Sequence, residues 1–193
     1  MRKKTATLLA AGAILAASCT ETYHTDSLGI PVTPEENREY SYTDKKSGYW
    51  YGNTHSVASQ WYSGWNIAKK RVLADYTLSI DGKPLDRSEA ECTVYPDRLV
   101  RKWDNAVETF RMVDNLPIIH IAVETDTDQT SIGLDHTLIE DSHMDNHSIF
   151  FIPKEAPDMR IMLSSDGENG FVLTYGTEEE CRALAAGFRT DGE

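Results

Sequence analysis

The sequence lacks the short motifs that carry most recognisable enzyme chemistry. It contains no G-x-S-x-G nucleophile motif, no HExxH zinc motif and no glycine-rich phosphate-binding loop. Cysteine is scarce, with three in 193 residues, and neither Cys92 nor Cys181 has a neighbouring histidine that could activate it. The sequence therefore identifies no catalytic residue and calls for no cofactor.

The sequence also lacks a hydrophobic run long enough to cross a membrane. The apolar run Thr7–Ala17 is short and follows the basic residues at positions 2–4, as in a secretory signal. We therefore assign residues 1–18 to a signal peptide. The small residues Ala16–Ser18 lead directly into Cys19, as in a bacterial lipoprotein signal, so Cys19 is the expected site of lipidation. A plain secretory signal with an incidental cysteine is the alternative.

Basic residues are few compared with acidic ones. The chain has 19 Lys and Arg against 31 Asp and Glu, a formal net charge of −12, and the predicted signal holds three of the basic residues. Such a surface repels nucleic acid and anionic lipid, which excludes nucleic acid as a partner and limits membrane contact to the lipid anchor. A neutral glycan remains a possible partner.

Two cysteines remain after Cys19. Cys92 and Cys181 lie far apart in the sequence, and nothing in it fixes their relative geometry. We expect two separate buried thiols, with a disulfide in an oxidising envelope as the alternative.

Short alternating segments separated by turn residues dominate the chain from Arg71 onward. Pro117–Glu124 is the most continuously apolar of them and is expected to be central in its sheet. This spacing predicts an all-β fold, an antiparallel β-sandwich with a short C-terminal helix. The predicted strands are Arg71–Ile80, Glu91–Tyr95, Arg98–Trp103, Ala106–Val113, Pro117–Glu124, Ser131–Leu134, Ser148–Ile152, Met159–Ser164 and Gly170–Tyr175.

The same patterns set the predicted domain boundaries. Residues 19–43 are polar and contain two prolines, so we expect an acylated tether whose last residues could enter the fold. Residues 44–175 form the predicted sandwich. Thr177 and Glu180 have capping-box spacing and open the helix predicted within residues 176–193, which could begin an interdomain linker.

The stretch Gly48–Asn66 is unusually aromatic. It holds three of the four tryptophans and three tyrosines, separated by small and polar residues, and predicts a strand, a loop and a short extended piece. The rings could close one end of the core, line a seam against another domain or stack on a glycan. We expect Trp65 to be in the core and Trp50 to be the most exposed tryptophan of this stretch. The candidate glycan or domain-interface residues are Trp50, Tyr51, Trp61, Tyr62 and Trp65.

Histidines suggest one further site. His136, His143 and His147 are interleaved with acidic residues, and the last two have i, i+4 spacing. A metal-assisted hydrolase built on them is an alternative hypothesis. The segment contains turn-forming residues and no known metal motif, so we interpret it as an acidic loop without a metal. His120 lies in an apolar strand and is expected to be a hydrogen-bonded core histidine.

Several strand-and-turn motifs carry a family resemblance over roughly residues 48–189. They are the runs Gly52–Ser56, Asp81–Leu85 and Tyr95–Arg101, with Glu108–Phe110 following. Together they resemble the N-terminal β-sandwich (super-sandwich) domain of glycogen-debranching-enzyme-like, six-hairpin glycosidases of Bacteroidetes-type bacteria.

The resemblance implies a function related to glycan breakdown. In that family the sandwich precedes a helical linker and an (α/α)₆ barrel, and the barrel holds the catalytic carboxylates. No position of this chain matches them. The resemblance thus implies a non-catalytic accessory sandwich of a debranching-type glycosidase, in an outer-membrane lipoprotein facing the periplasm or the cell surface. The chain would be truncated before its barrel or would work alone or beside a separate one. A stand-alone glycan-binding or structural envelope lipoprotein is the alternative.

Overall fold

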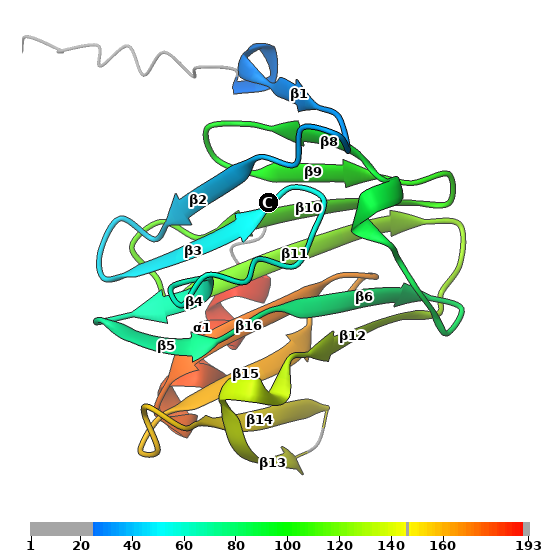
Figure 1. Ribbon diagram of the computed structural model, residues 1–193. Helices are drawn as coiled ribbons and strands as arrows, with labels where there is room; N and C mark the ends of the chain where they lie inside the picture. Colours follow the sequence, from blue (N-terminus) through cyan, green and yellow to red (C-terminus); the bar gives the residue numbers. More distant parts are fainter. Residues whose placement is uncertain (1–24, 146, 191–193) are drawn as a thin grey trace, which may run out of the picture.

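A nine-stranded antiparallel sheet forms one layer of the protein (Figure 1). The computed structural model describes residues 25–145 and 147–190, so Cys19 and the predicted signal lie outside the described residues. No described helix has the length and apolar character needed to span a membrane. The strands, in spatial order, are β1 (Ile30–Val32), β8 (Glu91–Val94), β9 (Leu99–Lys102), β10 (Ala106–Met112), β11 (Ile118–Thr125), β16 (Phe171–Gly176), β15 (Arg160–Ser165), β14 (Ser148–Pro153) and β13 (Ile139–Asp145).

Two smaller antiparallel sheets form the second layer. One has the order β2 (Glu39–Thr43), β3 (Gly48–Asn53), β4 (Gly64–Ile67) and β5 (Lys70–Leu73). The other has the order β12 (Thr130–Leu134), β6 (Tyr76–Ile80) and β7 (Lys83–Pro84). One continuous hydrophobic core joins these strands to the nine-stranded sheet. The predicted all-β antiparallel sandwich is therefore confirmed.

Alternating burial shows why these segments form strands. On β10 the residues Ala106, Glu108, Phe110 and Met112 face the core, and the residues between them do not. Period-two burial of this kind is what a strand with one buried face requires. The apolar strand predicted at Pro117–Glu124 is β11, the fifth of nine strands, so its central place is confirmed.

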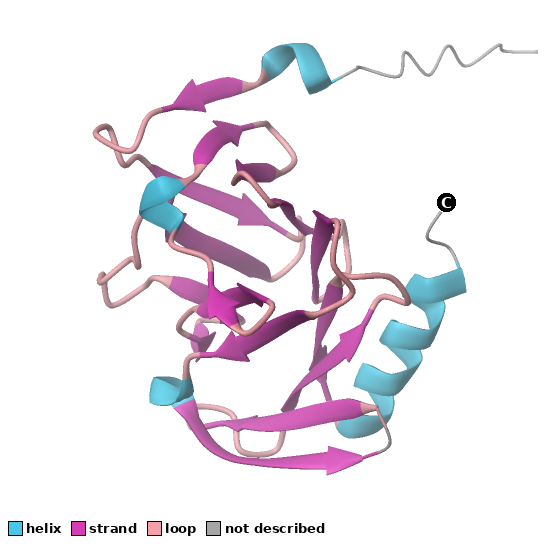
Figure 2. Cartoon of the chain, turned by 90° about the vertical axis from the view of Figure 1, so that its right-hand side faces the viewer, coloured by secondary structure: helices cyan, strands magenta, loops and turns pink. Residues whose placement is uncertain are grey.

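The helix α1 (Glu178–Thr190) covers the outer face of the nine-stranded sheet, against β15 and β16 (Figure 2). The predicted capping box is present. The backbone N–H of Thr177 donates to Glu180 Oε2 (2.7 Å), and the N–H of Glu180 donates to Thr177 Oγ1 (3.3 Å). Cys181 lies on the side of this helix that packs on the sheet, and Cys92 lies in the core between the layers. Both are buried and free, as predicted. Burial raises the pKa of Cys92 to about 11.

Three predicted segments differ from the structure. The single strand expected over Arg71–Ile80 is two strands, β5 and β6, because the buried Asp75 turns the chain from one small sheet into the other. There its carboxylate forms an ion pair with Arg87 (2.9 Å). The later part of the expected tether is folded: β1 and β2 lie within residues 30–43. The histidine segment is not a loop but the short 3₁₀ helix His136–Leu138 followed by β13.

Candidate functional site

The three tryptophans of the aromatic stretch lie in very different environments. Trp65 is fully buried, as predicted, but Trp50 is only 1% exposed, so its predicted exposure is wrong. Trp50 lies with Gly48 and Gly52 on the inner face of β3. Its indole N–H donates to the Tyr40 hydroxyl (3.2 Å). Trp61 is the exposed one, at 83%. Trp50 and Trp65 therefore close the core and cannot touch a partner.

The other three candidate residues form a small aromatic surface. The Trp61 and Tyr62 rings meet edge to face with centroids 5.3 Å apart, and the Tyr62 and Tyr51 rings do so at 4.8 Å. Tyr51 and Tyr62 are half-buried, whereas Trp61 projects into solvent. We call Tyr51, Trp61 and Tyr62 the aromatic platform.

The loop between β3 and β4 holds the platform in place. The N–H of Ser63 donates to the carbonyl of Gln60 (3.0 Å), and the Asn66 amide donates to the carbonyl of Tyr62 (2.9 Å). Gly64 follows with φ of +90°, and a Cβ there would lie 2.1 Å from the Leu73 carbonyl oxygen. Only glycine fits this position. Trp61 and Tyr62 therefore lie on a clamped turn.

The start of the same loop is fixed from inside the sandwich. His55 is buried, and its Nδ1 and Nε2 lie 2.9 Å from Thr54 Oγ1 and 3.1 Å from the Ala90 carbonyl oxygen. Arg101 Nε donates to the carbonyl of Thr54 (2.8 Å). Both ring nitrogens of His55 are thus engaged, and burial lowers its pKa. We conclude that His55 is a structural residue.

A buried ion pair joins the three sheets at this point. Arg101 on β9 and Glu108 on β10 face each other in register, with 3.0 Å between Nη1 and Oε2, and their side chains are 0% and 2% exposed. Tyr76 on β6 donates its hydroxyl to Glu108, and Arg101 reaches the Tyr40 hydroxyl on β2. Burial alone would lower the pKa of Arg101, but the charge and hydrogen bond of Glu108, together with Tyr40 and Tyr76, outweigh burial and raise it. Sequence reasoning missed this network.

A small cavity of about 170 Å³ opens beside this network. His55, Tyr76, Arg87, Trp103 and Glu108 contribute to its wall. Each of them already has a hydrogen-bond partner in the fold. These groups hold the layers together, so we assign the cavity no chemistry.

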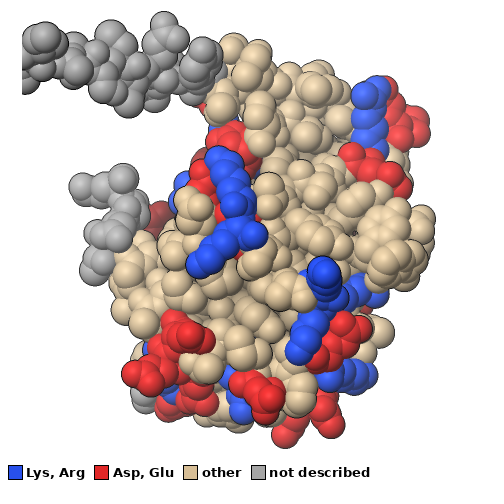
Figure 3. Space-filling model, turned by 90° about the vertical axis from the view of Figure 1, so that its left-hand side faces the viewer, with Lys and Arg blue, Asp and Glu red and all other residues tan. Residues whose placement is uncertain are grey.

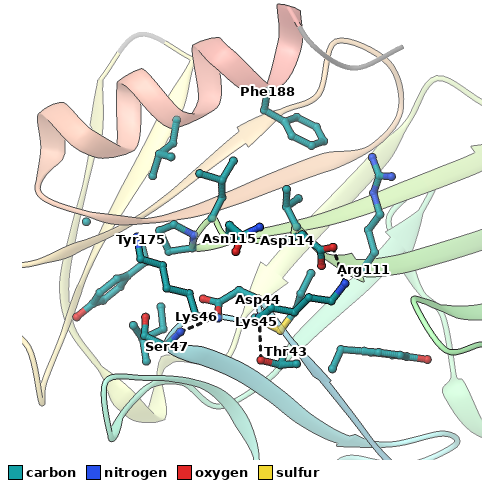
Figure 4. A pocket seen from close by; sticks show the side chains of 18 of the residues that line it. Thr43, Asp44, Lys45, Lys46, Ser47, Arg111, Asp114, Asn115, Tyr175 and Phe188 are labelled. Carbon is teal, nitrogen blue, oxygen red and sulfur yellow. Dashed lines mark hydrogen bonds and ion pairs between the residues drawn. The ribbon is translucent and has the colours of Figure 1, made fainter. Parts of the chain in front are cut away.

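A much larger groove, of about 1420 Å³, lies between α1 and three turns of the sandwich (Figure 4). The turns are those joining β2 to β3, β4 to β5 and β10 to β11. Figure 3 faces this side of the molecule, where both basic and acidic side chains surround uncharged surface. Four cationic side chains line it, Lys45, Lys46, Lys70 and Arg111, together with four carboxylates, Asp44, Asp97, Asp114 and Glu180. We call this site the basic groove after its cations.

The turn that carries Lys45 and Lys46 is held by Asp44. Its buried carboxylate oxygen Oδ1 accepts hydrogen bonds from the backbone N–H groups of Lys46, Ser47 and Gly48, at 2.8–2.9 Å. The carbonyl of Asp44 also accepts from the N–H of Asn115, which ties this turn to the β10–β11 turn. The side of the groove opposite α1 is thus rigidly built. Sequence reasoning missed it, because its residues come from distant segments.

The histidines predicted as a possible metal site have other contacts. The His143 ring stacks on Phe150 (5.2 Å), and its Nε2 lies 3.7 Å from Glu178. His136 meets Phe151 edge to face. Within residues 25–145 and 147–190, no three potential metal ligands gather into a site. The structure thus offers the metal hypothesis no assembled ligand set.

His120 lies outside the core, contrary to prediction. It is half-buried on the outer face of β11, where its ring is 4.9 Å from that of Phe188 on α1. It is hydrogen-bonded, to Asp166 and to Arg111.

Comparisons with protein families, curated proteins and solved structures find no match to this chain.

Proposed function

We propose that this protein is a non-catalytic glycan-binding β-sandwich of a bacterial envelope lipoprotein that serves glycan breakdown. The observation that carries this proposal is the exposed Trp61, held on a clamped turn beside Tyr62 and Tyr51.

Aromatic rings suit neutral sugars for a physical reason. The C–H face of a pyranose is apolar and packs on a flat ring, while tyrosine hydroxyls reach the sugar's hydroxyl groups. Because hydrogen bonds already hold the turn that carries Trp61, its backbone loses little conformational entropy when a ligand binds. A neutral ligand also avoids the repulsion that a net charge of −12 imposes on polyanions.

The test is a titration of the purified protein with maltohexaose, and separately with cellohexaose, monitored by tryptophan fluorescence. Trp50 and Trp65 are buried, so a ligand on the platform should change mainly the emission of Trp61. We expect saturable binding that Trp61→Ala abolishes and Met144→Ala, an exposed apolar control on β13, leaves unchanged. Equal binding by both variants would refute the platform as the site.

An accessory role beside a debranching-type glycosidase is the second candidate. Val57, which is 67% exposed, lies on the same loop as Trp61 and adds apolar surface that a protein partner could cover. In that case the isolated chain should bind a hydrophobic dye or self-associate through this loop, and added oligosaccharide should change neither behaviour. Trp61→Ala should then reduce the dye signal or the association.

A further inference from the structure

The basic groove carries an inference that is independent of the aromatic platform. We propose that it binds a small organic anion with an apolar body, of the chemical class of medium-chain carboxylates.

The wall that α1 contributes to the groove is apolar. Ala183, Leu184, Gly187 and Phe188 line it, and their spacing places them on one side of the helix. A different side, with Cys181 and Ala185, packs on Phe150 and Met162 of the sheet. A surface helix needs one apolar face to pack on its core. Among the described residues, the second apolar face of α1 borders the groove, with Phe188 packed beside His120.

The opposite wall combines the polar turns with apolar side chains. Leu116 on the β10–β11 turn is 39% exposed, and Ile67 and Met112 also line the groove. Where a ligand covers these apolar side chains, the hydroxyl groups of a sugar acid would lose hydrogen bonds to water without replacement, which costs binding energy. The body of the ligand is therefore apolar.

The charge of the groove selects an anion. Within the described residues, Lys46, Lys70 and Arg111 have no carboxylate within ion-pair distance, and Lys45 pairs with Asp114 (2.6 Å) at the surface. The carboxylates that line the groove already have partners: Asp44 accepts from backbone N–H groups, Asp97 pairs with Arg98, Asp114 with Lys45, and Glu180 accepts from Thr177. The three cations are therefore the charges left for a ligand. They attract a negative head group.

Arg111 is held ready for this head group. Its Nε–H can only donate, so the bond to His120 Nδ1 (3.2 Å) places the imidazole proton on Nε2, which donates to Asp166 Oδ2 (3.1 Å). The guanidinium carbon lies 5.9 Å from the centre of the Phe188 ring. Figure 4 draws the two side chains on the same side of the groove. The chain from Asp166 through His120 fixes Arg111 through Nε. No described residue hydrogen-bonds its two terminal nitrogens, which can therefore bind a carboxylate.

The experiment is calorimetric titration of the full chain with octanoate, 1-octanol and acetate, which separate the apolar body from the charged head. We expect octanoate to bind saturably, 1-octanol to bind about tenfold more weakly, as expected for loss of a charge-assisted hydrogen bond, and acetate to show no measurable binding. Arg111→Gln should weaken octanoate binding about tenfold and leave 1-octanol binding unchanged. Arg38→Gln, an exposed arginine outside the groove, is the matched control and should bind octanoate as the wild type does.

A second variant tests the apolar wall without disturbing the fold. A Cβ built on Gly187 meets no described atom within 4 Å, and leucine is the better helix former, so Gly187→Leu should fold and fill the groove. It should weaken octanoate and 1-octanol alike. The proposal is overturned if octanoate does not bind, if D-glucuronate binds as tightly as octanoate, or if Arg111→Gln and Gly187→Leu both bind octanoate normally.

Discussion

Arg101 offers the sharpest test of how the sandwich holds the loop between β3 and β4. Its buried guanidinium donates to the Thr54 carbonyl (2.8 Å), the Glu108 carboxylate (3.0 Å) and the Asn53 carbonyl (3.1 Å). Arg101→Met keeps most of the apolar stem but removes every donor. Glu108 is then left 2% exposed, with the Tyr76 hydroxyl as its remaining partner among the described side chains.

The expected cost follows from that burial. Removing one partner of a buried ion pair typically costs about 3–5 kcal/mol, because the remaining charge stays desolvated and unpaired. A domain of this size has a total stability of only about 5–15 kcal/mol, so the variant should be close to unfolding. Removing both charges, in Arg101→Met with Glu108→Leu, should cost clearly less than Arg101→Met alone, because no unpaired carboxylate remains.

Urea unfolding followed by circular dichroism measures these free energies, provided that the m-value is unchanged. Lys102→Met is the matched control: it lies next to Arg101 on β9 but is exposed, so it should change stability by less than about 0.5 kcal/mol. A loss below about 1 kcal/mol in Arg101→Met, or strictly additive effects of the two substitutions, would refute the argument that an uncompensated buried charge dominates.

Three further predictions use the same purified protein or cells that express it. Trp65→Ala should cost about 3–5 kcal/mol of stability and Trp61→Ala less than about 0.5, because only Trp65 is buried; similar urea midpoints for the two would contradict their assigned environments. Burial lowers the pKa of His55 and His120 below 6.5, so the unfolded chain binds protons at higher pH than the folded one. Stability should therefore fall as pH decreases through about 6.5, and less so in His55→Gln; a profile that rises on acidification would show the sign to be wrong. Cys19→Ala should abolish labelling by a fatty-acid probe and release the protein from the membrane fraction, and unchanged labelling would disprove lipidation at Cys19.

Local patterns in the sequence determined much of the architecture. The alternation along Ala106–Val113 and the apolar run Pro117–Glu124 correspond to β10 and β11, because a half-buried strand needs period-two burial and a central strand needs apolar residues on both faces. The Thr177 and Glu180 pair placed the start of α1. Each of these signals depends only on near neighbours, which the sequence contains.

Periodicity could not choose among the tryptophans. On β3, Trp50 alternates with Tyr49 and Tyr51, so both faces of the strand carry large aromatic rings and either could have been the buried one. Packing against the other sheets determines which face is buried. The ring centroid of Trp50 lies 5.2 Å from that of Phe110 and 5.6 Å from that of Tyr76, on strands of two other sheets. The turn that follows Trp61 likewise depends on tertiary contacts: Gly64 has φ of +90°, and a Cβ there would meet the carbonyl oxygens of Leu73 and Ala74 at 2.1 and 2.4 Å.

The two candidate sites depended on tertiary structure to different degrees. The platform residues are close in sequence, so their composition alone marked the stretch Gly48–Asn66 as unusual. The basic groove combines Lys45, Lys70, Arg111 and Phe188 from four distant segments, and no local pattern relates them. The same holds for Arg101 and Glu108, whose pairing exists only because β9 and β10 are in register and two further sheets close over them. Which charged residues lie close together depends on the fold, and the sequence alone does not give the distances between them.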